Sequence, residues 1–305
     1  MAVAPYIASV VLIAGIYIIF SFGLNLKFGF AGLIDFGHVA FMLIGAYTVA
    51  ILFNYGVPFL IAALLGIIVS GLSALIISLP TVKLRVDYLA IFTIGFSQIV
   101  VAVARNEEWL TGGTMGLHID FGLKKTPILG SIFHLTLIVI VTVIILYFIL
   151  GYILNSPWGR VLKSVREDEE VPKSVGKNVL SYKNQTLIIG SAIAGLAGIF
   201  LLLYNYSYIT PSMFLPMTTF YAWIIVIIGG SGNNRGTILG GLIFWTILEG
   251  TRFLRNYVPI AEERFGAIRM ALIGLIIILI MRFKPEGILG KKEEMVLEKE
   301  VETIG

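Results

Sequence analysis

The sequence from residue 155 to residue 183 reads Asn155-Ser-Pro-Trp-Gly-Arg-Val-Leu-Lys-Ser-Val-Arg-Glu-Asp-Glu-Glu-Val-Pro-Lys-Ser-Val-Gly-Lys-Asn-Val-Leu-Ser-Tyr-Lys183. This stretch carries six basic and four acidic side chains, and an apolar block of membrane-spanning length lies on each side of it. A loop this charged stays in water, and its basic excess favours the cytoplasmic face of a membrane. We therefore expect an integral membrane protein with a cytoplasmic loop over residues 155–183.

The loop has the pattern of two short helices. Ser156 and Pro157 are typical of the N-cap and the first position of a helix. The apolar residues that follow recur at the spacing of one helical face: Trp158, Val161, Leu162 and Val165. A second helix is predicted from about Glu169 to Val175, with Gly176 as a left-handed residue after its end. Such a pair of helices favours a docking surface for a soluble partner; the alternative is a solvated connector whose apolar stripe lies on the membrane.

The composition indicates an all-α, polytopic integral membrane protein. Of the 305 residues, 58% are hydrophobic and only 13% are charged, whereas soluble domains are about a quarter charged. We expect one transmembrane domain over residues 1–290 and a short charged cytoplasmic tail over residues 291–305. The chain has no cysteine, which excludes disulfides and thiolate metal sites. Its basic residues belong to membrane loops, so we expect membrane lipid and no nucleic acid as a partner.

Nine apolar blocks have roughly spanning length, which predicts about 8–10 transmembrane helices. The blocks cover residues 3–26, 31–53, 58–79, 88–105, 132–154, 184–204, 217–230, 237–254 and 267–283. The seventh is short and ends in Gly229-Gly-Ser-Gly232, which suits a broken helix. With the charged loop and the tail both inside the cell, fifteen of the 22 Lys and Arg residues, Lys27 among them, fall on the cytoplasmic side. This asymmetry predicts a cytoplasmic C-terminus in a plasma or inner membrane, while the side of the N-terminus depends on the true number of spans.

The first two blocks are joined by a stretch rich in glycine and polar residues, from Gly23 to His38. Irregular backbone at membrane depth survives only where it is buried in protein or lines a wet cavity. We therefore interpret this stretch as a broken segment at a translocation path. An ordinary tight turn on the cytoplasmic side is the alternative.

The sequence lacks the motifs of an enzyme. It has no nucleotide-binding G-x-x-x-x-G-K-[ST] run, no pair of histidines at helical metal-ligand spacing and no G-x-S-x-G nucleophile motif. We therefore expect no catalytic residue, cofactor or metal. Few ionisable residues lie within the apolar blocks, which disfavours a proton relay. Energy for uphill transport must then come from another polypeptide.

Four sets of residues resemble the permease subunits of branched-chain amino acid ATP-binding cassette (ABC) importers, of the LivM-like type. The first set is Gly23-Leu-Asn-Leu, Gly29, Gly32-Leu, Gly37-His38, Ala40-Phe41 and Gly45-Ala-Tyr47-Thr. The second is Leu84-Arg85, Asp87-Tyr88, Ala90-Ile91, Gly95-Phe96, Trp109-Leu-Thr-Gly-Gly113 and Gly116-Leu. The third is Ser156-Pro, Gly159-Arg160, Arg166-Glu-Asp-Glu169, Gly176, Asn178-Val, Tyr182-Lys183 and Ala194-Gly-Leu-Ala-Gly198. The fourth is Gly229-Gly-Ser-Gly232, Gly236, Leu239-Gly240, Arg282-Phe-Lys-Pro285, Gly287 and Leu289-Gly290.

The resemblance implies a subunit of an importer for branched-chain, hydrophobic L-amino acids. It implies a sister permease, two ABC ATPase subunits and an extracellular or periplasmic substrate-binding protein as partners. The coupling element that contacts the ATPase would then include Arg160, Arg166, Glu167, Asp168, Glu169 and Gly176. Similar proteins usually carry two alanines where this chain has Val171-Pro172, so a later start of the coupling helix is an alternative.

The expected translocation pathway runs near Asn25–Phe41 and Gly229–Gly232. Its candidate residues are Asn25, Gly29, Gly32, Asp35, Gly37, His38, Phe41, Gly229, Gly230 and Gly232. We expect these small and apolar residues to suit an uncharged side chain. Urea or short-chain amide ABC permeases share much of the pattern and remain an alternative. A secondary carrier or channel acting alone is disfavoured by the scarcity of charges within the apolar blocks.

Overall fold

The computed structural model describes residues 3–81, 86–119, 131–205 and 208–254, together with separate residues between 271 and 290. The first half of the chain begins with helix α1 (Val3–Asn25), which continues into the π-helical turn η1 (Leu26–Phe30). Three membrane helices follow: α2 (Val39–Asn54), α3 (Phe59–Thr81) and α4 (Val86–Asn106). The short elements α5 (Glu108–Thr111), η2 (Gly113–Met115) and β1 (Leu117–His118) complete this half.

The second half begins with α6 (Ile132–Asn155), which is followed by the two short helices α7 (Pro157–Glu167) and α8 (Glu170–Ser174). Helix α9 (Val179–Tyr204) leads to the strand β2 (Tyr208–Ile209) and the turn η4 (Pro211–Met213). Helices α10 (Pro216–Gly229) and α11 (Asn234–Leu254) follow. The expectation of an all-α, polytopic membrane protein is confirmed, because six stretches of the described chain are long and apolar enough to cross a bilayer.

Eight of the nine predicted apolar blocks coincide with described helices, and the short seventh block corresponds to α10. One start is wrong. Helix α2 begins at Val39 rather than near residue 31, because the polar and glycine-rich residues before it form an irregular segment. The predicted block over residues 267–283 lies mostly outside the described residues, and the predicted tail over residues 291–305 lies wholly outside them.

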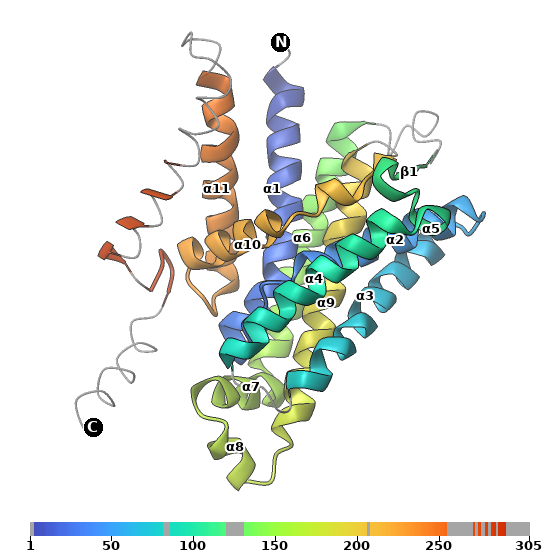
Figure 1. Ribbon diagram of the computed structural model, residues 1–305. Coiled ribbons are helices and arrows are strands. Elements are labelled where there is room, and N and C mark those ends of the chain that lie inside the picture. The colour runs from blue at the N-terminus through green and yellow to red at the C-terminus, as the bar shows by residue number, and fades with distance from the viewer. Residues whose placement is uncertain are drawn as a thin grey trace.

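The two ends of the helix bundle differ in character (Figure 1). Helices α7 and α8 project from one end, where the predicted loop over residues 155–183 is located. The antiparallel pair of β1 and β2 lies at the opposite end, with Leu117 paired to Ile209. The start of α1 also lies at that opposite end. The charged loop and the strand pair therefore lie at opposite ends of the helix bundle.

Helix α9 is the centre of the bundle, since it packs against α1, α2 and α3. Glycines allow this close packing. A Cβ atom on Gly45 of α2 would lie 2.5 Å from the Cα atom of Gly195 of α9, and one on Gly198 would lie 2.0 Å from the carbonyl oxygen of Met42. Small residues let helix backbones approach each other in lipid, where dispersion contacts replace the hydrophobic effect. The core is thus a tight stack of helix backbones.

Candidate functional site

The predicted broken segment is present between α1 and α2. The helical backbone widens to a π-turn over Leu26–Phe30 and then becomes irregular until α2 begins at Val39. Gly32 adopts a φ of 69°, a left-handed conformation that side chains other than glycine rarely adopt. The segment is a break at the centre of the bundle, so the alternative of an ordinary tight turn on the cytoplasmic side is not what the fold contains.

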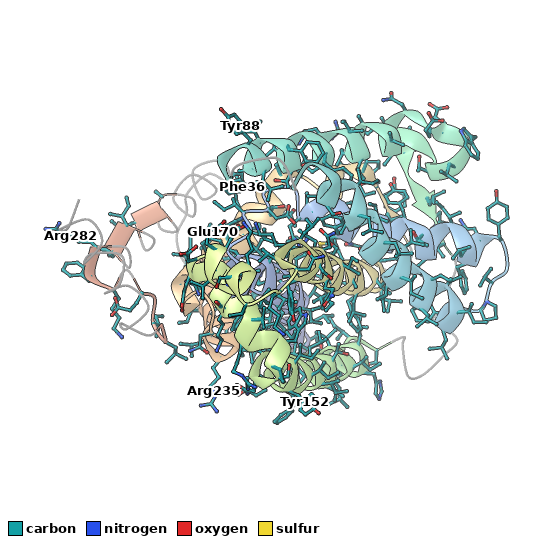
Figure 2. The ribbon with its side chains drawn as sticks, turned by 90° about the horizontal axis from the view of Figure 1, so that it is seen from below. Phe36, Tyr88, Tyr152, Glu170, Arg235 and Arg282 are labelled. Carbon is teal, nitrogen blue, oxygen red and sulfur yellow. The ribbon has the colours of Figure 1, made fainter. Side chains whose placement is uncertain are left out.

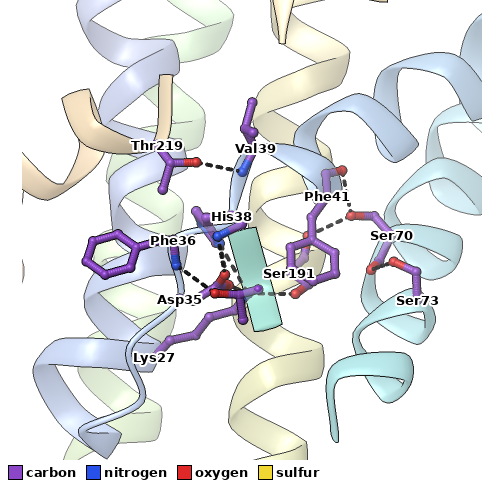
Figure 3. Close-up of polar contacts among 12 residues, drawn as sticks. Lys27, Asp35, Phe36, His38, Val39, Phe41, Ser70, Ser73, Ser191 and Thr219 are labelled. Atoms are coloured by element: carbon purple, nitrogen blue, oxygen red, sulfur yellow. Dashed lines mark hydrogen bonds and ion pairs between the residues drawn. The ribbon is translucent and has the colours of Figure 1, made fainter. Parts of the chain in front are cut away.

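A buried ion pair closes this break (Figure 3). The Lys27 ammonium group lies 2.7 Å from the Asp35 carboxylate, and both side chains are at most 1% exposed. The ammonium group also donates to the Ser191 hydroxyl of α9 at 2.8 Å and lies 4.1 Å from the centre of the Phe41 ring. A charge buried this deeply persists only when it is paired and hydrogen-bonded. Lys27 is therefore a structural charge of the core, and counting it among the cytoplasmic loop charges was wrong.

His38 completes the cluster. Its Nε2 atom lies 3.1 Å from the Phe20 carbonyl oxygen, which can only accept, so this nitrogen carries the hydrogen. In the neutral ring, Nδ1 is then left to accept a hydrogen bond from the Lys27 ammonium group at 3.1 Å. The cluster thus joins the end of α1, the start of α2 and the middle of α9 through fully buried polar contacts.

The irregular backbone after Asp35 is held by side chains from two further helices. Thr93 of α4 accepts from the Phe36 amide at 3.1 Å, and Thr219 of α10 accepts from the Val39 amide at 3.0 Å. The second carboxylate oxygen of Asp35 accepts from the Gly37 amide at 2.9 Å. These bonds satisfy amide groups that could not remain unpaired at membrane depth. Sequence reasoning did not find the two threonines, because their role depends on contacts between distant helices.

The two glycine-rich stretches that were predicted to line the pathway are brought together. The side-chain oxygen of Asn25 accepts from the Gly232 amide at 2.9 Å, and its amide nitrogen donates to the Asn234 side chain at 3.2 Å. A Cβ atom on Gly29 would lie 2.4 Å from the Gly232 nitrogen, so the two backbones touch. The turn between α10 and α11 therefore packs directly on the end of α1.

Most predicted pathway residues pack against protein in this structure. Eight are buried: Asn25, Gly29, Asp35, Gly37, His38, Phe41, Gly229 and Gly230. Gly32 and Gly232 are partly exposed. Beside them, an apolar groove of about 590 Å³ runs between α2 and α4. Its wall includes Tyr47, whose hydroxyl is buried and has no hydrogen-bond partner in the described part of the chain.

The predicted charged loop contacts the break directly. Helix α7 buries Leu162 and Val165 of its apolar stripe, while Arg166 extends toward the end of α1. The Arg166 guanidinium donates to the carbonyl oxygen of Gly29. Its side chain also lies beside Gly32, since a Cβ atom added to Gly32 would be 3.5 Å from the Arg166 Cγ atom. A predicted coupling residue and two predicted pathway residues therefore form one contact.

Helix α8 begins where the sequence suggested and not later. Asp168 accepts from the Glu170 amide at 2.9 Å at the start of the helix, and Gly176 has a φ of 73° just beyond its end. Pro172 lies in the first turn, where a missing N–H group breaks no intrahelical bond. The alternative that Val171-Pro172 delays the helix is therefore wrong. Val171 of α8 and Val175, the residue directly after the helix, are 55% and 69% exposed, so this segment presents apolar side chains to water.

The other predicted coupling residues surround these two helices. Glu169 forms an ion pair with Lys183 at the start of α9, which ties the loop between α7 and α8 to the bundle. Arg160 is exposed and donates weakly, at 3.4 Å, to the Asn155 carbonyl oxygen. Glu167 is also exposed, at the end of α7. Viewed from below, Glu170 of α8 lies over the end of the bundle (Figure 2).

Comparisons with known proteins agree with this architecture. Residues 6–281 match the family model described as "Branched-chain amino acid transport system / permease component". The high-affinity branched-chain amino acid transport system permease protein LivM of Salmonella typhimurium is 30% identical over 90% of this chain and 68% of its own length. A probable branched-chain amino acid transport permease protein LivM of Methanocaldococcus jannaschii is 28% identical over 94% of each chain.

A second type of relative is more distant. The permease protein LivH of the high-affinity system of Salmonella typhimurium is 26% identical over 66% of this chain and 58% of its own length. No solved structure matches the chain. The family match covers most of the sequence, including both stretches that meet at the break. The chain belongs to the family of permease components of branched-chain amino acid transport systems.

Proposed function

We propose that this chain is the transmembrane subunit of an ATP-driven importer for branched-chain L-amino acids. The observation that carries the proposal is the contact between Arg166 of α7 and Gly29 at the break in the first membrane helix. In this proposal, partner ATPases supply the energy, and the loop over residues 155–183 transmits their movement to the membrane helices.

The surface of α8 supports the docking step. Val171 of α8 and Val175, directly after its end, are exposed outside the bundle core, where a protein partner could cover them. The exposed ion pair between Lys173 and Glu170 (2.7 Å) lies on the same helix, and its hydrogen bond raises the pKa of Lys173. An apolar centre with a charged rim is the usual composition of a protein interface. An ATPase cleft is the occupant that this helix would fit.

The connection from α7 to the break supports the transmission step. Closure of the ATPase pair on ATP would move α8 and α7, and Arg166 would carry that movement to Gly29 and Gly32. The break can respond because its backbone is irregular and its glycines lack side chains. Segments with few helical bonds are where large backbone changes concentrate in hinge motions. We therefore assign alternating access to movements of this break.

The groove between α2 and α4 suits the proposed substrate. Its wall is almost entirely apolar, with Leu43, Phe96 and Val100 among the residues that line it. A branched aliphatic side chain gains free energy from such a wall through burial of its apolar surface. In this proposal the groove receives the substrate side chain, and an external binding protein performs most of the selection among amino acids.

The proposal includes three kinds of partner: a sister permease, two ABC ATPases and an extracellular or periplasmic binding protein. The occurrence of both LivM and LivH proteins among the relatives supports a permease pair. The proposed orientation in the plasma or inner membrane places α7, α8 and the C-terminus in the cytoplasm.

Reconstitution tests the function. The chain would be purified with two ATPases, a sister permease and the binding protein, and leucine uptake into liposomes would be measured with and without ATP. We expect ATP-dependent leucine accumulation by the whole assembly and none by this chain alone. ATP-dependent uptake of urea in place of leucine would favour a urea permease. Accumulation by the isolated chain would favour a secondary carrier and overturn the proposal.

A further inference from the structure

A basic cavity of about 870 Å³ lies at the end of the bundle that carries α7. Its walls come from the last turns of α6, the start of α7 and the turn between α10 and α11. Among the described residues, the charged ones that line it are Lys163 and Arg235, and none is an aspartate or glutamate. Two cations that share a cavity without a carboxylate attract an anion.

Arg235 is held in place by a contact across the cavity. Its Nε atom donates to the Tyr147 hydroxyl of α6 at 2.9 Å. An arginine side chain has five N–H donors in a fixed planar arrangement, so this bond orients the guanidinium and leaves its terminal nitrogens for a further acceptor. Within the described part of the chain, neither Arg235 nor Lys163 forms an ion pair. Both charges are therefore available to a ligand.

The remaining walls add polar donors to the cavity. Asn155 and Ser231 contribute an amide and a hydroxyl group. Ser156 and Asn233 also line the cavity, but the Ser156 hydroxyl donates to the Ile153 carbonyl oxygen and the Asn233 side chain to the Leu289 carbonyl oxygen. Helix α7 begins at Pro157, so the positive end of its dipole adjoins this space. Helix α11 also begins here, at Asn234, but the Asn233 side chain caps its Arg235 and Gly236 amides. The helix dipole adds to the positive potential of the two side chains. The cavity therefore favours an anionic phosphate group over an uncharged ligand.

The position of the cavity favours a lipid as the source of that phosphate. Helix α6 is the least buried of the candidate membrane spans, with 22% of its most apolar window buried. At its end, Phe148 and Tyr152 are 67% and 83% exposed, and both line the cavity. Exposed aromatic rings at the end of a membrane helix lie at the level of lipid headgroups. Figure 2 places Tyr152 and Arg235 on the same rim of the molecule.

We propose that this cavity binds the phosphate of an anionic phospholipid, through Lys163 and Arg235, with the acyl chains lying along α6. A lipid bound there bridges α6, α7 and the turn before α11, and so fixes the base of the helix that carries Arg166. The binding itself is independent of the transported solute and of the ATPase partners, so it can be tested without assuming the proposed function.

Native mass spectrometry of the purified chain tests the site, with the chain released from micelles containing equal amounts of phosphatidylglycerol and phosphatidylcholine. We expect preferential retention of phosphatidylglycerol. Either Arg235→Gln or Lys163→Gln should weaken that retention about fivefold, since each cation near an anionic headgroup contributes about 1 kcal/mol. Arg105→Gln is the matched control, because Arg105 is an exposed arginine near the end of α4, outside the cavity lining, and its loss removes the same charge. It should leave retention unchanged.

Two further variants separate the site from general effects. Tyr147→Phe keeps both charges but removes the acceptor that orients Arg235, so it should weaken retention less than Arg235→Gln. Thermal unfolding of each variant in detergent without added lipid should match that of the unaltered chain, which excludes misfolding as the cause. A further experiment adds inorganic phosphate to the chain in the presence of phosphatidylglycerol. We expect millimolar phosphate not to displace the lipid.

Equal retention of the two lipids by the unaltered chain would overturn the proposal. It would also be overturned if Arg105→Gln weakened phosphatidylglycerol retention as much as Arg235→Gln or Lys163→Gln. Full competition by inorganic phosphate would also overturn it and would assign the cavity to a soluble phosphate. Failure of leucine transport in the reconstituted assembly, with selective lipid retention intact, would contradict the proposed function and leave this lipid site standing.

Discussion

Arg166 of α7 and Gly29 of η1 are separated by 137 residues in the chain, yet the Arg166 guanidinium donates a hydrogen bond to the Gly29 carbonyl oxygen. The arginine belongs to the most hydrophilic loop of the protein and the glycine to the break in its first membrane helix. The hydrogen bond therefore joins the loop directly to the break between α1 and α2. A carbonyl within a π-turn is available for such a bond because the normal helical pattern is interrupted there.

The buried ion pair between Lys27 and Asp35 gives a prediction for stability. Asp35→Asn leaves the Lys27 charge buried without a counter-charge, which should destabilise the protein by about 3–5 kcal/mol. Thermal unfolding in detergent, followed by tryptophan fluorescence, measures the loss. The exposed pair is the matched control: Glu170→Gln also removes one carboxylate from a lysine–carboxylate pair and should leave the unfolding midpoint unchanged.

The double variant Lys27→Met/Asp35→Asn tests the cause of that loss. It removes both charges and keeps a side-chain oxygen for the Gly37 amide. It should therefore unfold at a higher temperature than Asp35→Asn alone, because no unpaired charge remains. If both variants unfold at the same temperature, the loss arises from packing rather than from charge.

The contact between α2 and α9 predicts a strict size limit at Gly45. The Cβ atom of an alanine would lie 2.5 Å from backbone atoms of Gly195, which cannot move independently of α9. We expect Gly45→Ala to cost about 1–3 kcal/mol of stability. Gly250→Ala is the control, since Gly250 lies in α11 with no atom of the described residues within 4 Å of the added Cβ atom. It should be neutral or stabilise by up to about 1 kcal/mol. Thermal unfolding that ranks the two alanines in the opposite order would contradict the described packing.

Substitution of Tyr47 should raise the stability of the protein, because of its hydroxyl group. This group is buried and has no hydrogen-bond partner among the described residues, so Tyr47→Phe should stabilise the protein by about 1 kcal/mol. Tyr6→Phe is the control, because the Tyr6 hydroxyl donates to the Glu249 carbonyl oxygen at 2.8 Å, and loss of that bond should lower the unfolding temperature. A lower unfolding temperature for Tyr47→Phe would show that this hydroxyl does have a partner in the membrane.

The exposed valines in and directly after α8 predict how the ATPase docks. Val175→Asp should abolish co-purification of the ATPase with this chain, because it places a charge in the apolar centre of the proposed contact. Val175→Ile keeps an apolar side chain and should retain the ATPase. The unfolding temperature of the isolated chain should be the same for both, since Val175 contacts mainly water. Normal co-purification of the Val175→Asp variant would place the docking surface elsewhere.

Much of the fold could be predicted from the sequence because hydrophobic length and loop charge are local signals. The limits of α6 and α10 and the end of α9 lie close to the predicted blocks, and α8 begins within one residue of its predicted start. The break before α2 was also predictable from its glycines and polar residues. These features depend on neighbouring residues and need no knowledge of tertiary contacts.

Other features depend on which helices meet. Lys27 was assigned to a cytoplasmic loop because counting of positive charges ignores burial, although a lysine close to Asp35 and His38 in an apolar region is itself a signal of a buried cluster. The contribution of Ser191 could not be predicted, since it lies 164 residues away in sequence. The pairing of β1 with β2 likewise joins segments far apart in the chain.

The ratio of leucine imported to ATP hydrolysed, in liposomes containing the complete assembly, tests the central claim most directly. Arg166→Gln removes the charged donor to Gly29 and keeps α7 exposed to the ATPase, so we predict that hydrolysis continues while the ratio falls at least about tenfold. Lys177→Gln, an exposed change of the same charge beyond α8, should leave the ratio unchanged. An unaltered ratio in the Arg166→Gln assembly would contradict the account, because the loop would then drive the membrane helices without its contact to the break.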